Sequence, residues 1–278
     1  MLDSYKNIYN HFFKKVISMY PLRTASIRDN QLLNALPEAD QHRIQHFFQL
    51  TELTQGMVLS EPGTTQSFVY FPITAIISLL YVLADGSSTE MAVIGREGCV
   101  GTPVFMGGRS SLNQVMVHTA GYAYKLRAMD LQEEFSRGGI TSSILLRFTQ
   151  ALMTQMAQLA VCNRHHQLDQ QICRWLLQTL DRMDGDEILM THELISQMLG
   201  VRREAITHAA NRLQKEGLIS YTRGRIKVTD RHGLMRKSCE CYGVLNREYT
   251  RLLPQAKPKT ATTTLAQQYR KYYDCTHM

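Results

Sequence analysis

Apolar residues recur at helical spacing in two adjacent short segments, one on each side of Gly200. The first segment starts at Thr191, a favourable N-cap residue, and carries Ile195 and Leu199 one helical turn apart. The apolar residues of the second segment are Ile206, Ala209, Ala210 and Leu213. Gly200 lies where the chain must turn sharply, and such turns often need a positive φ. The pattern predicts two short helices that pack against each other as a helix-turn-helix.

The polar residues of the second helix are predicted to face outward. They are Glu204, Thr207, His208 and Asn211, and Arg203 opens the helix. Side chains of these types donate to and accept from base edges in the major groove of DNA. An ordinary helical hairpin is the alternative for this segment taken alone.

The next segment, residues 217–229, favours the nucleic-acid interpretation. Apolar residues alternate over residues 218–221 and 226–228, around the sequence Thr222-Arg223-Gly224-Arg225. This pattern is typical of a two-stranded wing with a basic tip. A helix-turn-helix followed by a basic wing is far more specific than either part alone.

Residues 51–127 show the period of strands and turns. Glycines separate short runs that are rich in β-branched and aromatic residues, such as IISLLYVL, QVMVHT and YAYKL. Regular turns of this kind predict a small antiparallel barrel or sandwich. Two helical pieces, broken at Pro37, are predicted before it in residues 30–50.

After Asp130 the period is helical again. An apolar stripe that includes Leu145, Leu152, Met156 and Leu159 predicts a helix of about twenty residues or more. Either the stripe packs on the chain's own barrel or it pairs with the same helix of a second subunit. Further helices are predicted over residues 168–183 and 236–253. The fold class is therefore α+β, with an N-terminal jelly-roll-like antiparallel β-roll, a long helix and a C-terminal winged helix-turn-helix.

Length and charge fit this organisation. The chain has 278 residues, enough for two domains, and a formal net charge of +7. Residues 201–237 contain ten Lys and Arg residues against three Asp and Glu residues. This concentration favours a surface that contacts phosphates, and a solvated basic face is the alternative.

The six cysteines show no paired disulfide framework, which predicts reduced thiols. Cys239-Glu240-Cys241 is either half of a metal site or a pair of incidental thiols, and no second pair at zinc spacing accompanies it. His118 is either a haem ligand or a satisfied polar residue. We predict incidental thiols, no metal and no cofactor.

Several other classes are disfavoured. The sequence lacks G-x-S-x-G, H-E-x-x-H, phosphate-loop and dinucleotide motifs, so we predict no catalytic residue. The N-terminus lacks the apolar core and cleavage site of a signal peptide. The most apolar run, residues 68–84, is shorter than a membrane helix. We therefore predict a cytoplasmic protein with no membrane partner.

The order of these parts resembles the Crp/Fnr family of bacterial transcription regulators, with a β-roll, a long central helix and a winged helix reading VRREAITHAANRLQKEGLISYTRGRIKV. The resemblance covers about residues 30–253. It implies a homodimer joined along the long helix and bound to a pseudo-palindromic operator in double-stranded DNA. RNA polymerase and an unidentified small-molecule effector are further partners that it suggests. A ligand-gated module whose basic winged helix binds protein or RNA is the alternative.

Transferred residue by residue, the resemblance places Arg203, Glu204 and His208 at the base-reading positions. His208 departs from the arginine of the catabolite activator type, so the operator sequence cannot be transferred. The phosphate-facing positions hold Thr191, His192, Arg202, Ala205 and Asn211. We expect the wing to add Arg223, Arg225 and Lys227.

In the β-roll, the family's cyclic-nucleotide cassette needs a Gly-Glu pair for the ribose and an Arg-Ser or Arg-Thr pair for the cyclic phosphate. The matching positions hold Thr102 and the pair Ser111-Leu112. Both charges are missing unless Glu97 and Arg109 substitute for them, so we expect an effector other than cyclic AMP. The candidate residues of the effector pocket are Glu97, Gly101, Thr102, Arg109 and Ser111.

The predicted boundaries follow from these patterns and from the resemblance. They are an N-terminal extension (1–29), a cyclic-nucleotide-binding-like β-roll sensor domain (30–139), a dimerisation helix (140–165), a winged helix-turn-helix DNA-binding domain (166–253) and a disordered tail (254–278). No cysteine precedes Cys99, so the chain lacks the N-terminal cluster that holds an iron–sulfur centre in the oxygen-sensing branch.

Overall fold

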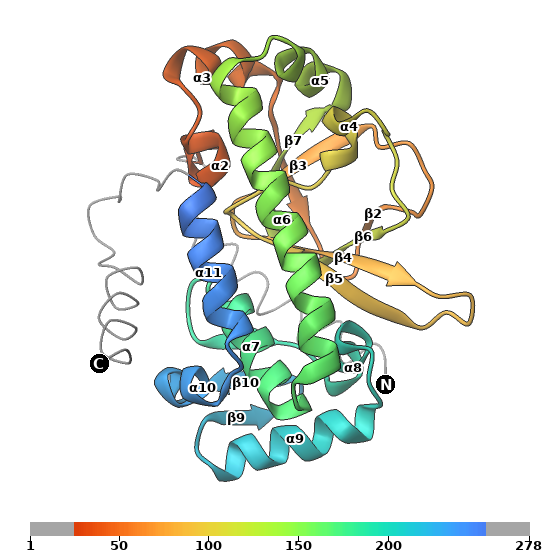
Figure 1. Ribbon diagram of the computed structural model, residues 1–278, viewed down its shortest axis with the longest axis vertical. Helices are drawn as coiled ribbons and strands as arrows, with labels where there is room; N and C mark the ends of the chain where they lie inside the picture. Colours follow the sequence, from red (N-terminus) through yellow and green to blue (C-terminus); the bar gives the residue numbers. More distant parts are fainter. Residues whose placement is uncertain (1–24, 254–278) are drawn as a thin grey trace.

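The computed structural model describes residues 25–253 (Figure 1). Most of the predicted N-terminal extension and all of the predicted tail lie outside the described residues. The described part is α+β, as the sequence predicts. The long helix α6 (Gly139–His165) runs alongside the β-roll, and the winged helix-turn-helix lies at the C-terminal end of α6, in contact with the β-roll (Figure 1).

The β-roll consists of two antiparallel sheets, with strand orders β1-β7-β3 and β2-β6-β4-β5. Their strands are β1 (Gln49–Leu53), β2 (Val58–Ser60), β3 (Phe68–Pro72), β4 (Ile76–Val82), β5 (Ser88–Ile94), β6 (Gln114–Thr119) and β7 (Gly121–Arg127). Short helices accompany them: η2 (Ile27–Asp29), α2 (Gln31–Asn34), α3 (Glu38–Ile44), η3 (Gln45–Phe47), α4 (Thr102–Met106) and α5 (Ala128–Ser136).

The two sheets enclose the first hydrophobic core. On β3, Val69 and Phe71 are buried and stand opposite Leu126 and Tyr124 of β7. Ile77 of β4 contributes from the other sheet. Alternate residues are buried because successive side chains of a strand point to opposite faces of the sheet.

The long helix α6 (Gly139–His165) crosses this core (Figure 1). Leu145, Phe148 and Leu152 are buried among the β-roll residues, and Met156 packs beside them. Of the two interpretations that the sequence left open for this stripe, packing on the chain's own barrel is therefore correct for these residues.

The winged helix-turn-helix has its own core. Its elements are α7 (Leu168–Leu180), β8 (Glu187–Leu189), α8 (His192–Leu199), α9 (Arg203–Lys215), β9 (Ile219–Thr222) and β10 (Arg225–Val228), with strand order β8-β10-β9. Trp175 and Leu176 of α7 pack with Ile206 and Leu213 of α9. Strand β8 is too short to show a pattern in the sequence.

The helix predicted over residues 236–253 is shorter in the structure, α11 (Cys241–Leu252), and a separate helix, α10 (Arg231–Lys237), precedes it. Ser238 ends α10 in an extended conformation, with φ −67° and ψ 158°. The apolar spacing continues across this break, which is why the sequence suggests one helix. Helix α11 lies beside α6 (Figure 1), where the Tyr249 hydroxyl donates to Gln155 Oε1 at 2.9 Å.

Candidate functional sites: a basic winged helix, a β-roll pocket and a thiol cluster

The turn of the helix-turn-helix is made by Gly200, which adopts the left-handed conformation with φ 65°. A Cβ at this position would lie 2.5 Å from Thr89 Oγ1 of β5, so the glycine also permits close approach to the β-roll. Thr191 caps α8 by accepting a hydrogen bond from the Leu194 amide at 3.2 Å. Both roles follow the sequence prediction.

Helix α9 buries one face and exposes the other. Ile206, Ala209, Ala210 and Leu213 are buried. Arg203, Glu204, His208 and Asn211 are exposed, and Arg202 precedes them as the exposed N-cap residue. Ala205 is half-buried, so only its backbone and methyl group can contact a ligand. The exposed face therefore presents both donors and acceptors.

Thr207 and His192 do not project outward freely. Thr207, predicted to face outward, is half-buried, and its hydroxyl donates to the Arg203 carbonyl at 3.1 Å. His192 Nδ1 lies 3.0 Å from the same hydroxyl, and its ring stacks on Tyr221 at 4.0 Å. Burial lowers the pKa of His192 and favours the uncharged imidazole. His192 therefore joins α8 to α9 and to the wing, and offers a phosphate no charge near neutral pH.

The wing turns through Arg223 and Gly224, whose φ values are 48° and 80°. Two consecutive left-handed residues are typical of a tight hairpin turn, and they place the exposed Arg223 at the tip. Arg225 Nη1 donates to Glu187 at 3.0 Å, and Lys227 Nζ lies 3.7 Å from Asp186. Arg223 is the wing cation for which the described residues provide no carboxylate within 4 Å.

Ion pairs also reduce the charge of the rest of the basic segment. The pairs are Arg212 with Asp169, Arg231 with Asp181, Arg236 with Asp230 and Lys237 with Glu216. Asp169 and Asp181 come from α7 and its C-terminal end, outside the basic segment. A count along the sequence therefore overestimates how much positive charge is available to a polyanion.

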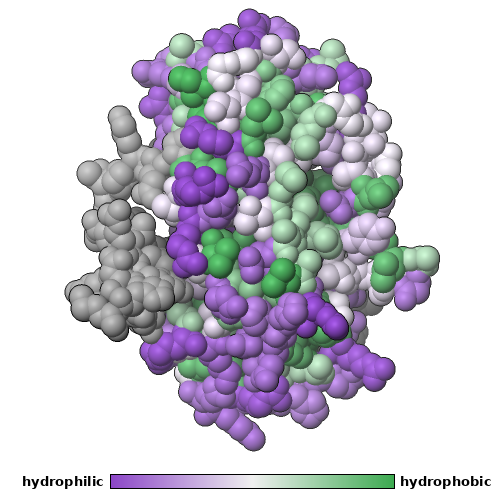
Figure 2. Space-filling model, in the orientation of Figure 1, coloured by the Kyte–Doolittle hydropathy of each residue, from purple (hydrophilic) through white to green (hydrophobic). Residues whose placement is uncertain are grey.

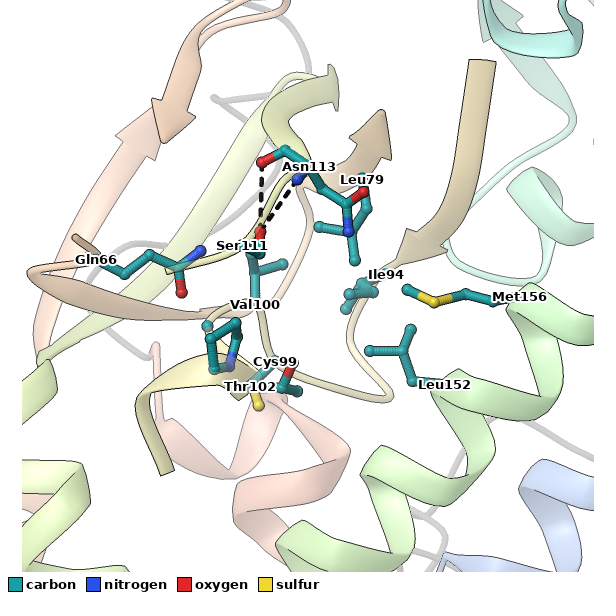
Figure 3. Close-up of a pocket in the computed structure, with 12 residues that line it drawn as sticks. Gln66, Leu79, Ile94, Cys99, Val100, Thr102, Ser111, Asn113, Leu152 and Met156 are labelled. Atoms are coloured by element: carbon teal, nitrogen blue, oxygen red, sulfur yellow. Dashed lines mark hydrogen bonds between the residues drawn. The ribbon is translucent and has the colours of Figure 1, made fainter. Parts of the chain in front are cut away.

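A small pocket lies between the β-roll and α6 (Figure 3). Three of the five predicted residues line it: Gly101, Thr102 and Ser111. Leu152 and Met156 reach it from α6 (Figure 3). The described lining contains polar but no charged side chains; its remaining residues are Gln66, Leu79, Ile94, Cys99, Val100, Pro103 and Asn113.

The other two predicted effector-pocket residues, Glu97 and Arg109, do not line this pocket. Glu97 Oε1 accepts from Arg182 Nε at 2.7 Å, which joins the β-roll to the end of α7. Arg109 is exposed with φ 57°, and its guanidinium donates to Gln132 at 3.1 Å. Neither side chain replaces a missing charge of the cyclic-nucleotide cassette in this pocket.

Buried polar groups join the β-roll to α7. Burial raises the pKa of Glu90 to about 7, although Ser78 Oγ donates to its carboxyl at 2.5 Å. His118 packs against Trp175 of α7 with ring centroids 5.4 Å apart, and burial lowers its pKa to about 3. His118 is therefore a neutral packing residue of this interface. Its Nδ1 lies 2.8 Å from Thr119 Oγ1, whereas its buried Nε2 has no hydrogen-bond partner among the described residues, so it is only partly the satisfied polar residue that the sequence suggests.

One cluster of potential metal ligands was missed. Cys162 and His166, one turn apart at the end of α6, meet Cys239 and Cys241 from the α10–α11 junction. Their four ligand atoms all lie within 4.8 Å of one another. A hydrogen bond with Cys239 lowers the pKa of the Cys162 thiol to about 5. The sequence showed half of this group, and the other half lies about 75 residues earlier in the chain.

The outer face of α6 is not covered by the described chain. Its exposed residues repeat with alternating spacings of three and four: Ser143, Leu146, Gln150, Met153, Ala157, Ala160 and Arg164. Leu146 and Met153 are 53% and 62% exposed. Hydrophobic and near-neutral side chains gather along the middle of this side of the molecule, over α6 (Figure 2).

Comparisons with known proteins agree with this architecture. Residues 170–237 match the model of the Crp-like helix-turn-helix domain. A structure described as a Crp/Fnr-family regulator from Eubacterium rectale is 16% identical, with TM-score 0.61, over 76% of this chain and 98% of that one. FixK2 from Bradyrhizobium japonicum is 14% identical, with TM-score 0.60, over 69% and 98%.

A third similar structure is the c-di-GMP responsive global regulator CLP from Xanthomonas campestris, 14% identical with TM-score 0.56 over 70% of this chain and all of that one. No curated protein sequence matches the chain. Between residues 25 and 253, no helix is both long and apolar enough to cross a membrane.

The fold and the winged helix define the class of protein. Residues 170–237 match the Crp-like helix-turn-helix domain, and the fold of the described chain is similar to that of solved Crp/Fnr-type regulators. The resemblance predicted from the sequence is confirmed for the helix-turn-helix domain and for the overall fold.

Proposed function

We propose that this protein is a homodimeric transcription regulator that binds a pseudo-palindromic operator in double-stranded DNA. The arrangement of three elements carries the proposal. The N-terminus of α8, the exposed face of α9 and the tip of the wing lie side by side, because His192 contacts both Thr207 and Tyr221. The Met190 amide further ties this surface to Gly224 at the wing tip.

Each part of the surface has a distinct role. Arg203 and His208 donate to base edges, and Glu204 accepts from a cytosine amino group. Thr191, Arg202, Ala205 and Asn211 lie at phosphate-facing positions, with exposed side chains at Arg202 and Asn211. Arg223 adds a cation that has no carboxylate within 4 Å among residues 25–253, whereas Arg225 and Lys227 already contact carboxylates. Phosphate contacts position the protein, and base contacts give specificity.

The second subunit is proposed to cover the outer face of α6. The alternating three-and-four spacing of its exposed residues is the repeat by which two helices pack side by side. Leu146 and Met153 are large apolar side chains on this repeat, and Ala157 and Ala160 permit close approach. Two recognition helices placed about one DNA turn apart, ~34 Å, would fit successive major grooves.

The effector remains unidentified and is proposed not to be cyclic AMP. A cyclic phosphate transferred from water into the pocket would lose hydration without gaining an ion pair, because the described lining has no cation. A ligand in this pocket would contact Leu152 and Met156 and thus the same helix as the proposed dimer interface (Figure 3). This contact is how binding would alter the separation of the recognition helices.

Salt dependence distinguishes this function from the alternative of a module that binds protein or RNA. The affinity of the purified protein for pooled genomic DNA fragments and for pooled RNA would be measured at two salt concentrations. We expect preference for the duplex DNA and a steep loss of affinity at the higher salt concentration, as counterion release requires. Equal binding of RNA, or affinity that hardly changes with salt, would favour the interaction module.

A further inference from the structure

The Cys162–His166–Cys239–Cys241 cluster differs from the other buried thiols of the described chain. Cys99 and Cys173 lie singly within the two hydrophobic cores. Cys162, Cys239 and Cys241 instead form a buried cluster of their own, at most 3% exposed. Hydrophobic packing explains a single buried thiol, but it gives no reason to gather three thiols around an imidazole.

The distances match the coordination sphere of one small ion. Cys162 Sγ lies 3.5 Å from Cys239 Sγ, and Cys241 Sγ lies 3.4 Å from His166 Nδ1. In a tetrahedral zinc site, bonds of about 2.3 Å to sulfur and about 2.0 Å to nitrogen separate the ligand atoms by roughly 3.5–3.8 Å. Ligand atoms within 4.8 Å of one another can surround one ion but leave no room for a multi-iron cluster.

His166 has the contacts that are typical of a metal-binding histidine. His166 turns Nδ1 toward the thiols, and its Nε2 lies 3.2 Å from the Glu240 carboxylate. Histidines that bind zinc commonly donate the other ring N–H to a carboxylate, which fixes the tautomer and the ring orientation. Gln158 Nε2 also donates to Cys241 Sγ at 3.1 Å, as an outer hydrogen bond to a thiolate would.

We propose that Cys162, His166, Cys239 and Cys241 bind one zinc ion. Three thiolates and one imidazole form a preferred zinc donor set, and soft sulfur ligands disfavour magnesium and calcium. All four tetrahedral positions are filled by the protein, which is typical of structural rather than catalytic zinc. Binding deprotonates the thiols and releases their protons to solvent, with no change of oxidation state.

The position of the site gives the ion a mechanical role. Cys162 and His166 end α6, and α7 begins two residues after His166. Cys239 and Cys241 occupy the junction at which α10 gives way to α11. One ion would therefore fix the hinge between the long helix and the winged helix to the α11 segment that packs along α6. The metal site itself does not depend on the proposed DNA binding.

Metal content of the full-length chain tests the proposal directly. The protein would be purified under reducing conditions without chelator, and zinc, iron and inorganic sulfide would be determined. We expect one zinc per chain and neither iron nor sulfide. Cys239→Ser with Cys241→Ser should abolish bound zinc, whereas Cys173→Ala, which removes a buried thiol from the winged-helix core, should retain it. Glu240→Gln should weaken zinc affinity about 10- to 100-fold.

Cobalt substitution keeps the test independent of how the variants fold. Zinc-free wild-type protein, titrated with cobalt(II) without oxygen, should develop the visible and thiolate charge-transfer absorption of tetrahedral thiolate-bound cobalt, saturating at one equivalent. Zinc should then displace it. Wild-type protein that develops no such spectrum, that contains iron and sulfide, or that is isolated with a Cys162–Cys239 disulfide would overturn the proposal.

Discussion

Arg203 and Arg223 are both exposed cations of the winged helix, yet their positions predict different effects on DNA. Arg203 opens α9, where a guanidinium can reach a base edge. Arg223 is at the wing tip, from which we expect it to contact backbone phosphates. The contrast tests which residues read sequence and which only position the protein.

Arg203→Ala should relax the preference at one base pair of each half-site and cost about 1–3 kcal/mol on the preferred sequence. Its affinity for random DNA should change much less. The measurement is fluorescence anisotropy on a selected operator and on its single-base variants. Equal losses on operator and random DNA would contradict the assignment.

Arg223→Ala should weaken binding to all sequences alike and reduce the salt slope of log affinity by about 0.9 per chain. Lys227→Ala is the matched control, because Lys227 Nζ already lies 3.7 Å from Asp186 and should have the smaller effect. Titrations at several salt concentrations measure both slopes. A larger change for Lys227→Ala would show that the ion pair does not persist on DNA.

For single residues, the sequence predicts roles that depend on the local helix or strand, but it does not show contacts with side chains from distant parts of the chain. The exposed face of α9 follows from helical spacing alone, so Arg203, Glu204 and His208 lie where the pattern places them. The burial of Thr207 and His192 depends on Tyr221 of the wing, which no local pattern shows. For the same reason, the sequence did not show that Glu97 pairs with Arg182 and Arg109 with Gln132 instead of lining the pocket.

Among the elements, α6 has two apolar faces, and the described chain covers only one of them. One face packs Leu145, Phe148 and Leu152 into the β-roll. The other exposes Leu146 and Met153. The spacing of the apolar residues alone is compatible with packing on the β-roll and with pairing to a second helix. The sequence does not show which of these residues the β-roll covers.

Leu146→Glu combined with Met153→Glu should dissociate the dimer, because two carboxylates on each helix would be buried without partners. A cost of about 3 kcal/mol or more raises the dissociation constant at least roughly a hundredfold. Sedimentation velocity over a range of concentrations measures the shift. Met129→Glu, at a 77% exposed apolar residue of α5, is the control and should leave a dimer. A double variant that remains dimeric would place the interface elsewhere.

The interface between the β-roll and α7 should make stability depend on pH through Glu90. Its pKa is raised from 4.5 to about 7 by burial, so the folded chain holds a proton there that the unfolded chain has lost. The stabilising contribution of this proton to the free energy of unfolding is complete below about pH 4.5 and is lost as the pH rises through about 7. It amounts to at most about 3 kcal/mol, at about 1.4 kcal/mol for each pKa unit.

Glu90→Gln keeps a polar group of similar size but cannot titrate. Chemical denaturation between about pH 5 and pH 8 should show that the free energy of unfolding falls less steeply with pH in this variant than in wild type. Glu52→Gln, at an exposed carboxylate of β1, should retain the wild-type slope. Identical slopes in wild type and Glu90→Gln would show that Glu90 titrates normally.

The whole molecule brings the pocket, the proposed dimer face and the thiol cluster onto one helix, α6. Leu152 and Met156 reach the pocket, Leu146 and Met153 face outward, and Cys162 lies at the end. The order of β-roll, long helix and winged helix was predictable because the spacing of apolar residues differs between the three parts of the sequence. The thiol cluster was not, because its ligands come from segments about 75 residues apart.

Two recognition helices of one dimer are proposed to read a two-fold symmetric DNA sequence. Selection of bound genomic fragments by purified wild-type protein, with and without cyclic AMP, tests this proposal most directly. We predict an enriched inverted repeat whose half-sites are about one turn, ~34 Å, apart, with affinity unchanged by the nucleotide. An enriched motif without two-fold symmetry, or no enriched motif in either condition, would contradict the claim.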